Sequence, residues 1–227
     1  MATLLRSLTR NLEAPPFGRG SLALSFVLVL FRTFILSPDS SHGETGSPAF
    51  QARDVVKRGA VEVGVLTGYH QALDVLTSVS ANRSAVHVLP RVGIVLTDEL
   101  GGGLFSGNIE LLGEILYAHH LNPFSAEAAG GSLGIKYNLL SFGRWMPYWG
   151  VGAGMLWTNL APRISEQSTP FNFVLRSGPG IQYFLTDRVV PTFDAGFYHV
   201  SNAGIGDRNR GLNAVFLSLG VSIMFSK

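Results

Sequence analysis

From Gly59 onward, apolar and polar residues alternate with a period of two, in segments that turn-forming residues separate. This period places alternate side chains on opposite faces of a β-strand. The eight segments span residues 59–70, 84–98, 107–118, 128–140, 146–159, 171–186, 188–201 and 211–225. No helical pattern of useful length competes with them, so the sequence predicts an all-β domain over residues 50–227.

One face of these strands is long, apolar and almost free of charge. In the last segment, Leu217, Leu219 and Val221 alternate with Ser218 and Gly220. The other face combines glycines with Glu62, Glu110, Glu114, Lys136, Arg176 and Asp194. An apolar exterior around a polar interior is typical of a membrane barrel, and an even number of strands closes the sheet without an unpaired edge. We therefore predict an eight-stranded antiparallel outer-membrane β-barrel; a soluble exported barrel, with its apolar face inside, is the alternative.

The connectors predict which end of the barrel faces the cell exterior. With both termini in the periplasm, the exterior connectors are 71–83, 119–127, 160–170 and 202–210. Periplasmic turns of such barrels are short, as at 141–145. The connector at 99–106, which contains three consecutive glycines, is longer than this rule predicts.

Charge and cysteine content exclude several classes of protein. Charged residues make up 14% of the chain, against about 25% in soluble domains. Residues 1–40 hold four arginines and two acidic residues, which leaves 13 basic and 13 acidic residues elsewhere, so no basic face for nucleic acid is expected. The chain has no cysteine, which excludes disulfides, thiolate metal sites and cysteine nucleophiles.

The N-terminal segment predicts export. Arg6, Arg10 and Arg19 precede an apolar run at about 21–36, which is the order of a signal peptide. We assign residues 1–49 to this targeting segment and an N-terminal extension, without a defined cleavage point. A transmembrane anchor is the competing interpretation, but Arg32 interrupts the run, which is also short for a span of about 20 residues.

The segment 188–201 ends with a histidine and a serine in an unusual setting. Parity places His199 and Ser201 on the outward face with Phe197, where polar groups are costly unless they have partners or a task. Two residues apart on a strand, they lie about 7 Å apart, within reach of a base–nucleophile contact. Because such a pair is common by chance, spacing alone also fits an interfacial structural role. Four other histidines lack a comparable setting and are interpreted as loop or lumen residues: His70, His87, His119 and His120.

The stretch H-V-S-N-A-G-I-G-D-R-N-R-G-L-N at 199–213 resembles the signature of PagL-type lipid A 3-O-deacylases and related acyloxyacyl hydrolases. Weaker likeness extends over the barrel, at 58–64, 110–114 and 147–154. The resemblance implies a serine esterase of the bacterial outer membrane. It implies removal of the 3-O-linked hydroxyacyl chain from lipid A of lipopolysaccharide, with no metal or cofactor.

The same resemblance implies a role for each motif residue. Ser201 is the expected nucleophile and His199 the general base. The oxyanion hole is expected from the backbone amides of Ser201 and Gly204, because donors placed for the developing charge lower the barrier. Support of the hole and its loop is expected from Asn202, Gly204, Asn209 and Gly211.

One position departs from the family pattern. The family carries a glutamate that orients the histidine, and Asn213 stands in its place. If the last two strands pair symmetrically about Gly206, Asn213 lies opposite His199. An asparagine can hold an imidazole through its carbonyl but cannot stabilise imidazolium by charge. Asp207 is a candidate substitute, although it is otherwise a solvated turn residue, and Glu114 and Asp194 fall on the lumen face.

Other functions remain open at this stage. A non-enzymatic barrel of the OmpX or OmpA type would lack an outward polar constellation, and a lipid A palmitoyltransferase would carry a signature that the sequence lacks. The substitution at Asn213 also allows a degenerate family member that binds lipid A without cleaving it. The oligomeric state is open as well, with a homodimer among the options.

Overall fold

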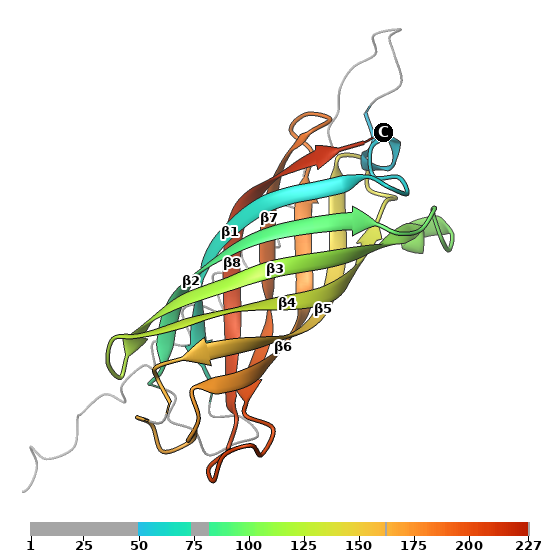
Figure 1. Ribbon diagram of the computed structural model, residues 1–227. Coiled ribbons are helices and arrows are strands. Elements are labelled where there is room, and N and C mark those ends of the chain that lie inside the picture. Colours follow the sequence, from blue (N-terminus) through green and yellow to red (C-terminus); the bar gives the residue numbers. More distant parts are fainter. Residues whose placement is uncertain (1–49, 74–81, 162, 227) are drawn as a thin grey trace, which may run out of the picture. The chain divides into compact units, whose positions relative to one another are not determined.

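The computed structural model describes residues 50–73, 82–161 and 163–226. Its strands are β1 (Val61–Ala72), β2 (Ser84–Val95), β3 (Gly107–Asn122), β4 (Ala126–Leu139), β5 (Trp145–Thr158), β6 (Phe171–Tyr183), β7 (Val189–Ser201) and β8 (Leu212–Phe225). Each strand pairs antiparallel with the next, and β1 pairs with β8, so the sheet is a closed barrel (Figure 1). This confirms the predicted fold. The predicted targeting segment lies outside the described residues.

The predicted strand boundaries differ from the observed ones by a few residues. β2 and β6 end three residues earlier than predicted, whereas β3 continues to Asn122. The extension of β3 arises because His119 and His120 pair with both neighbouring strands and are not in a loop. Two short 3-10 turns, η1 (Ala52–Asp54) and η2 (Gly103–Phe105), complete the described structure. Neither of these turns, nor any other helix of the described residues, is long and apolar enough to cross a membrane.

The apolar face of the sheet points outward. Leu133 is 68% exposed and Ile115 is 62% exposed, whereas Glu62 and Lys136 on the opposite face are almost completely buried. Exposed aliphatic and aromatic side chains around a polar interior are typical of a barrel that is surrounded by lipid hydrocarbon. The soluble alternative requires the reverse orientation and is therefore wrong.

Ion pairs fill the lumen. Lys136 Nζ lies 2.5 Å from Glu62 Oε2 and 3.0 Å from Glu110 Oε2. Arg91 Nη2 lies 2.5 Å from Asp194 Oδ2, on a strand from the other side of the barrel. Buried charges are tolerated when they are paired in this way. The lumen is thus a packed polar core.

An apolar plug closes the end of the barrel that carries the C-terminus. Residues of η1 and the segment after it pack against side chains from β2, β5, β7, β8 and two turns; the cluster contains Ala52, Val55, Val56, Ala60, Val95, Leu140, Met146, Phe184, Val190 and Met224. Asn108 Nδ2 donates a hydrogen bond to the Val56 carbonyl and fixes this segment to the wall. The alternation of the strands did not predict the plug, because residues 50–58 lie outside it.

Candidate active site

The β7–β8 hairpin brings His199 and Asn213 together. Strand pairing places the two residues directly opposite each other, which confirms the predicted register. The His199 Nδ1 atom lies 2.6 Å from Asn213 Oδ1. An amide oxygen only accepts hydrogen bonds, so Nδ1–H donates and the neutral ring presents Nε2 as an acceptor. This orientation leaves Nε2 able to take a proton.

Asn213 is much less exposed than its neighbours on the same strand face. Its exposed fraction is 3%, whereas Val215, two residues along, is 41% exposed. The Leu73 amide donates a hydrogen bond to the Asn213 carbonyl and helps to cover it. The imidazole is therefore held from a shielded position, where a hydrogen bond is stronger than in water.

Ser201 lies two residues from His199, on the same face of β7, and pairs with Phe173 of β6. Both His199 and Ser201 are half-buried. Within the described part of the chain, no hydrogen bond joins the Ser201 hydroxyl to the His199 ring. Catalytic contacts are commonly long without substrate and tighten when it binds.

A tight turn follows Ser201. Ala203 and Gly204 have φ values of 52° and 81°, and the Ile205 amide donates to the Asn202 carbonyl at 3.0 Å. Positive φ at both central residues, together with this hydrogen bond, is typical of a type I′ turn. The turn places the backbone of Gly204 just beyond the end of β7.

The side chain of Asn202 is the centre of the loop. It is completely buried, and its Oδ1 accepts a hydrogen bond from the Gly204 amide at 3.0 Å. Its Nδ2 donates to the Arg208 carbonyl, and its backbone amide donates to Asn209 Oδ1 at 3.1 Å. The structure thus brings Asn202, Gly204 and Asn209 together. The Gly204 amide, an expected oxyanion donor, is bonded to Asn202 Oδ1 within the loop in this structure.

Gly211 supports the histidine by having no side chain. Its φ is 70°, a conformation that favours glycine. A Cβ atom at this position would lie 2.8 Å from His199 Cε1, closer than atoms pack. Both the backbone conformation and the space beside the ring therefore require glycine.

The β5–β6 connector lies beside the site loop, which the sequence did not predict. The Arg210 amide donates to the Glu166 carbonyl, and Gln167 forms a β-bridge with Asn209. The Glu166 carboxylate lies 2.5 Å from Arg83 Nη2, and both side chains are buried. This ion pair ties the connector to the start of β2. Arg83 and Glu166 are 83 residues apart and no periodic pattern links them, so the sequence alone does not predict this ion pair.

The other candidates occupy separate places. Asp207 is exposed in the loop, and the His199 Nδ1 atom is bonded to Asn213 instead. Glu114 and Asp194 face the lumen, where they pair with arginines, as predicted. His119 bonds to Glu127 at the end of the strand pair.

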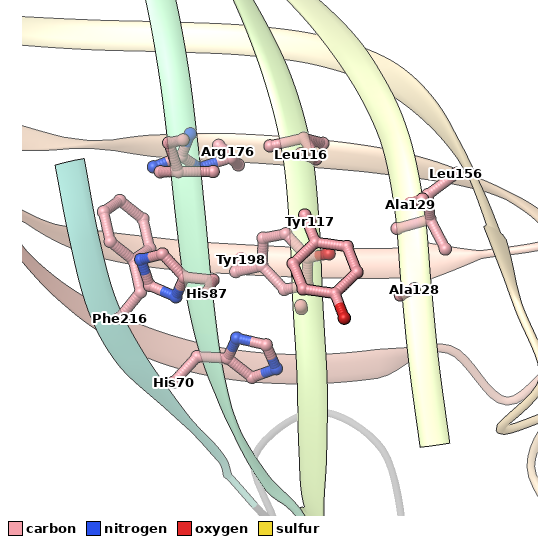
Figure 2. Close-up of a pocket in the computed structure, with 12 residues that line it drawn as sticks. His70, His87, Leu116, Tyr117, Ala128, Ala129, Leu156, Arg176, Tyr198 and Phe216 are labelled. Atoms are coloured by element: carbon pink, nitrogen blue, oxygen red, sulfur yellow. The ribbon is translucent and has the colours of Figure 1, made fainter. Parts of the chain in front are cut away.

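Inside the barrel, three of the described histidines lie together: His70, His87 and His120. His70 and His87 stack with ring centroids 5.8 Å apart, and Tyr198 also stacks on His70, at 5.4 Å (Figure 2). His120 meets the edge of His70. These side chains are lumen residues, as predicted. Among the described residues, no group of three or more His, Asp or Glu side chains is arranged to hold a metal ion.

Comparison with known proteins identifies the family. The family model described as lipid A 3-O-deacylase (PagL) matches residues 99–222. The crystal structure of the outer-membrane enzyme PagL aligns with a TM-score of 0.51 and 15% identity, covering 70% of this chain and 97% of that one. Neisserial surface protein A aligns with a TM-score of 0.44 and 16% identity, over 75% of this chain and all of that one. No curated protein matches by sequence.

At these identities the solved structures show the fold alone, whereas the family model carries the relationship. The barrel and the family place the protein in the bacterial outer membrane. The matched region contains the whole motif from His199 to Asn213 and covers more than half of the sequence. The chain therefore belongs to the lipid A 3-O-deacylase (PagL) family.

Proposed function

We propose that this protein is a serine esterase that removes the 3-O-linked hydroxyacyl chain from lipid A. The observation that carries the proposal is the outward-facing His199, whose Nδ1 is held by the buried Asn213 and whose strand neighbour on the same face is Ser201. An oriented imidazole beside a hydroxyl is the arrangement that nucleophilic ester hydrolysis requires.

The reaction takes two stages on these residues. The Ser201 Oγ attacks the ester carbonyl while its proton moves to His199 Nε2, and the tetrahedral intermediate collapses as His199 returns that proton to the departing sugar hydroxyl. Water then attacks the acyl-serine, again with His199 as base, and the hydroxy fatty acid leaves. The Ser201 amide and the Gly204 amide supply the oxyanion donors, the latter once substrate displaces Asn202 Oδ1 from it.

The position of the residues fits a lipid substrate. His199 and Ser201 lie on the outer wall, at the end of the barrel opposite the apolar plug. An acyl chain can approach them from the membrane without entering the lumen. Charged side chains and the plug fill the interior, so this arrangement favours approach of the acyl chain along the outer wall.

A second function has a specific observation behind it. Asn213 stands where the family is expected to carry glutamate, and the Gly204 amide is bonded to Asn202. Both features fit a family member that binds lipid A without cleaving it. The homodimer that the sequence leaves open has no support in the family or in the related structures.

Mass spectrometry of lipid A separates these functions. The refolded protein and a Ser201→Ala variant are incubated with lipopolysaccharide, and heat-dependent gel mobility verifies that both are folded. Loss of one hydroxyacyl chain with the unchanged protein alone is the expected result. Lipid A that stays intact with both, together with saturable lipid A binding, would assign the protein to the non-cleaving class.

A further inference from the structure

The connector between β2 and β3 has a form that barrel closure does not require. It runs from Leu96 to Ser106 and contains the 3-10 turn η2. Figure 1 shows it, in green, extending past the ends of β2 and β3. Gly101 and Gly103 have φ values of 73° and 60°, which allows the chain to fold back within a few residues.

Two acidic side chains of this connector form ion pairs with arginines in and near η1. Glu99 lies 3.4 Å from Arg53 Nη1 and accepts a hydrogen bond from Ser106. Asp98 lies 3.8 Å from Arg58 Nη1. Both acidic residues thus have basic partners in the segment around η1, and the charge of the connector is neutralised on that side.

The tip of the connector is strongly apolar and uncovered. We call Leu100, Leu104 and Phe105 the apolar tip; their exposed fractions are 41%, 66% and 76%. Phe105 is more exposed than any other large apolar side chain among the described residues. Large apolar groups that are held in water are unfavourable, and contiguous ones mark an interaction surface.

The tip is attached to the lipid-facing wall. The Tyr137 hydroxyl donates a hydrogen bond to the Phe105 carbonyl at 2.8 Å, and Tyr137 lies two residues from Ile135, which is 51% exposed on the outward face of β4. Ser141 also donates to the Gly103 carbonyl. The tip therefore continues the apolar wall, with a tyrosine at the junction, a residue type enriched at membrane interfaces.

We propose that the apolar tip inserts into the inner leaflet of the outer membrane and that its partner is a phospholipid surface. The connector lies at the end of the barrel that carries the C-terminal end of β8 and the plug, and this end meets the inner leaflet with both termini in the periplasm. Continuity with the apolar wall favours lipid over a protein partner. The proposal rests on the membrane barrel and does not depend on the esterase activity.

The absence of cysteine from the chain gives a clean test. Leu104→Cys and Phe105→Cys variants carry a nitroxide spin label in the protein refolded into phosphatidylethanolamine and phosphatidylglycerol vesicles. Leu133→Cys, on the exposed wall, is the hydrocarbon control. Asp187→Cys, in the exposed β6–β7 turn at the same end, is the water control. Power saturation with oxygen and with a water-soluble nickel chelate reports the surroundings of each label.

The expected result is that the labels at 104 and 105 favour oxygen over nickel, as the label at 133 does. Nickel access equal to that at 187 would place the tip in water and overturn the proposal. Spin–spin broadening that disappears when labelled protein is diluted with unlabelled protein would show a second copy on the tip, which also overturns it. Because both tip side chains are largely exposed, the labels replace few packing contacts.

Discussion

The contact between His199 and Asn213 fixes how the imidazole meets a substrate. The 2.6 Å hydrogen bond holds Nδ1, and Gly211, which has no side chain, leaves room for the imidazole ring beside its backbone. Strand parity predicted the outward position of His199, and symmetric pairing predicted its partner. The capture of the Gly204 amide by Asn202 could not be predicted, because it depends on the rotamer of a buried side chain.

Asn213→Glu tests whether charge is the missing component of the site. A carboxylate opposite His199 would stabilise imidazolium in the transition state, so we expect the deacylation rate to rise about tenfold or more, or ~1.4 kcal/mol. Asn213→Leu removes the acceptor and is expected to lower the rate by roughly a hundredfold. Rates are measured on lipid A in vesicles. A leucine variant as fast as the unchanged protein would argue against any role of Asn213 in orienting His199.

Gly211→Ala tests the space beside the ring. The added Cβ would push against His199 Cε1, whereas Gly143, with a similar φ of 65°, has no atom within 4 Å of such a Cβ. Both alanine variants are expected to lose about 1 kcal/mol of stability from the backbone conformation. Only the variant at 211 is expected to lose activity. Equal activities for the two would show that the ring tolerates displacement.

At the scale of elements, alternation predicted the eight strands and their faces, since every strand has one side against lipid and one against the lumen. The β7–β8 hairpin was also predictable, because its turn residues stand between two alternating segments. The plug and the contacts of the β5–β6 connector were not. Their contacts join residues such as Arg83 and Glu166, which no local period links.

Glu166→Gln tests whether this connector supports the site loop. The substitution leaves the buried Arg83 without its ion-pair carboxylate, and breaking a buried pair in this way costs about 3 kcal/mol. We expect faster hydrogen exchange at the amides of residues 202–210, which the connector braces. Asp98→Asn, in an exposed pair, is the control and is expected to leave exchange there unchanged. Unchanged exchange in both variants would show that the ion pair does not stabilise the loop.

Across the whole molecule, the residues that stabilise the barrel and the candidate catalytic residues lie on different faces of the sheet. The lumen carries the ion pairs and the plug, whereas His199 and Ser201 use the outer wall. The interior can therefore be altered without touching the candidate active site. The sequence predicted this division through parity, but not which charged residues pair across the lumen.

Lys136→Met tests the interior. It leaves the carboxylates of Glu62 and Glu110 buried without their shared cation, so we expect the free energy of unfolding to fall by roughly 3–5 kcal/mol. Urea unfolding in vesicles, followed by tryptophan fluorescence, measures the change. Arg58→Gln removes one partner of an exposed pair and is expected to cost no more than about 1 kcal/mol. Similar losses in the two variants would mean that the central ion pairs contribute little.

The ion pairs of the lumen also constrain how the chain enters the membrane. Glu62 of β1 meets Lys136 of β4, and Arg91 of β2 meets Asp194 of β7, so the partners lie on strands that are distant in sequence. A half-assembled sheet in lipid would present each of these charges to hydrocarbon without a partner, which is prohibitively costly. We therefore expect that the strands do not insert one at a time. Neutralisation of the interior and closure of the sheet are then expected to occur together, so that the barrel enters the bilayer already curved.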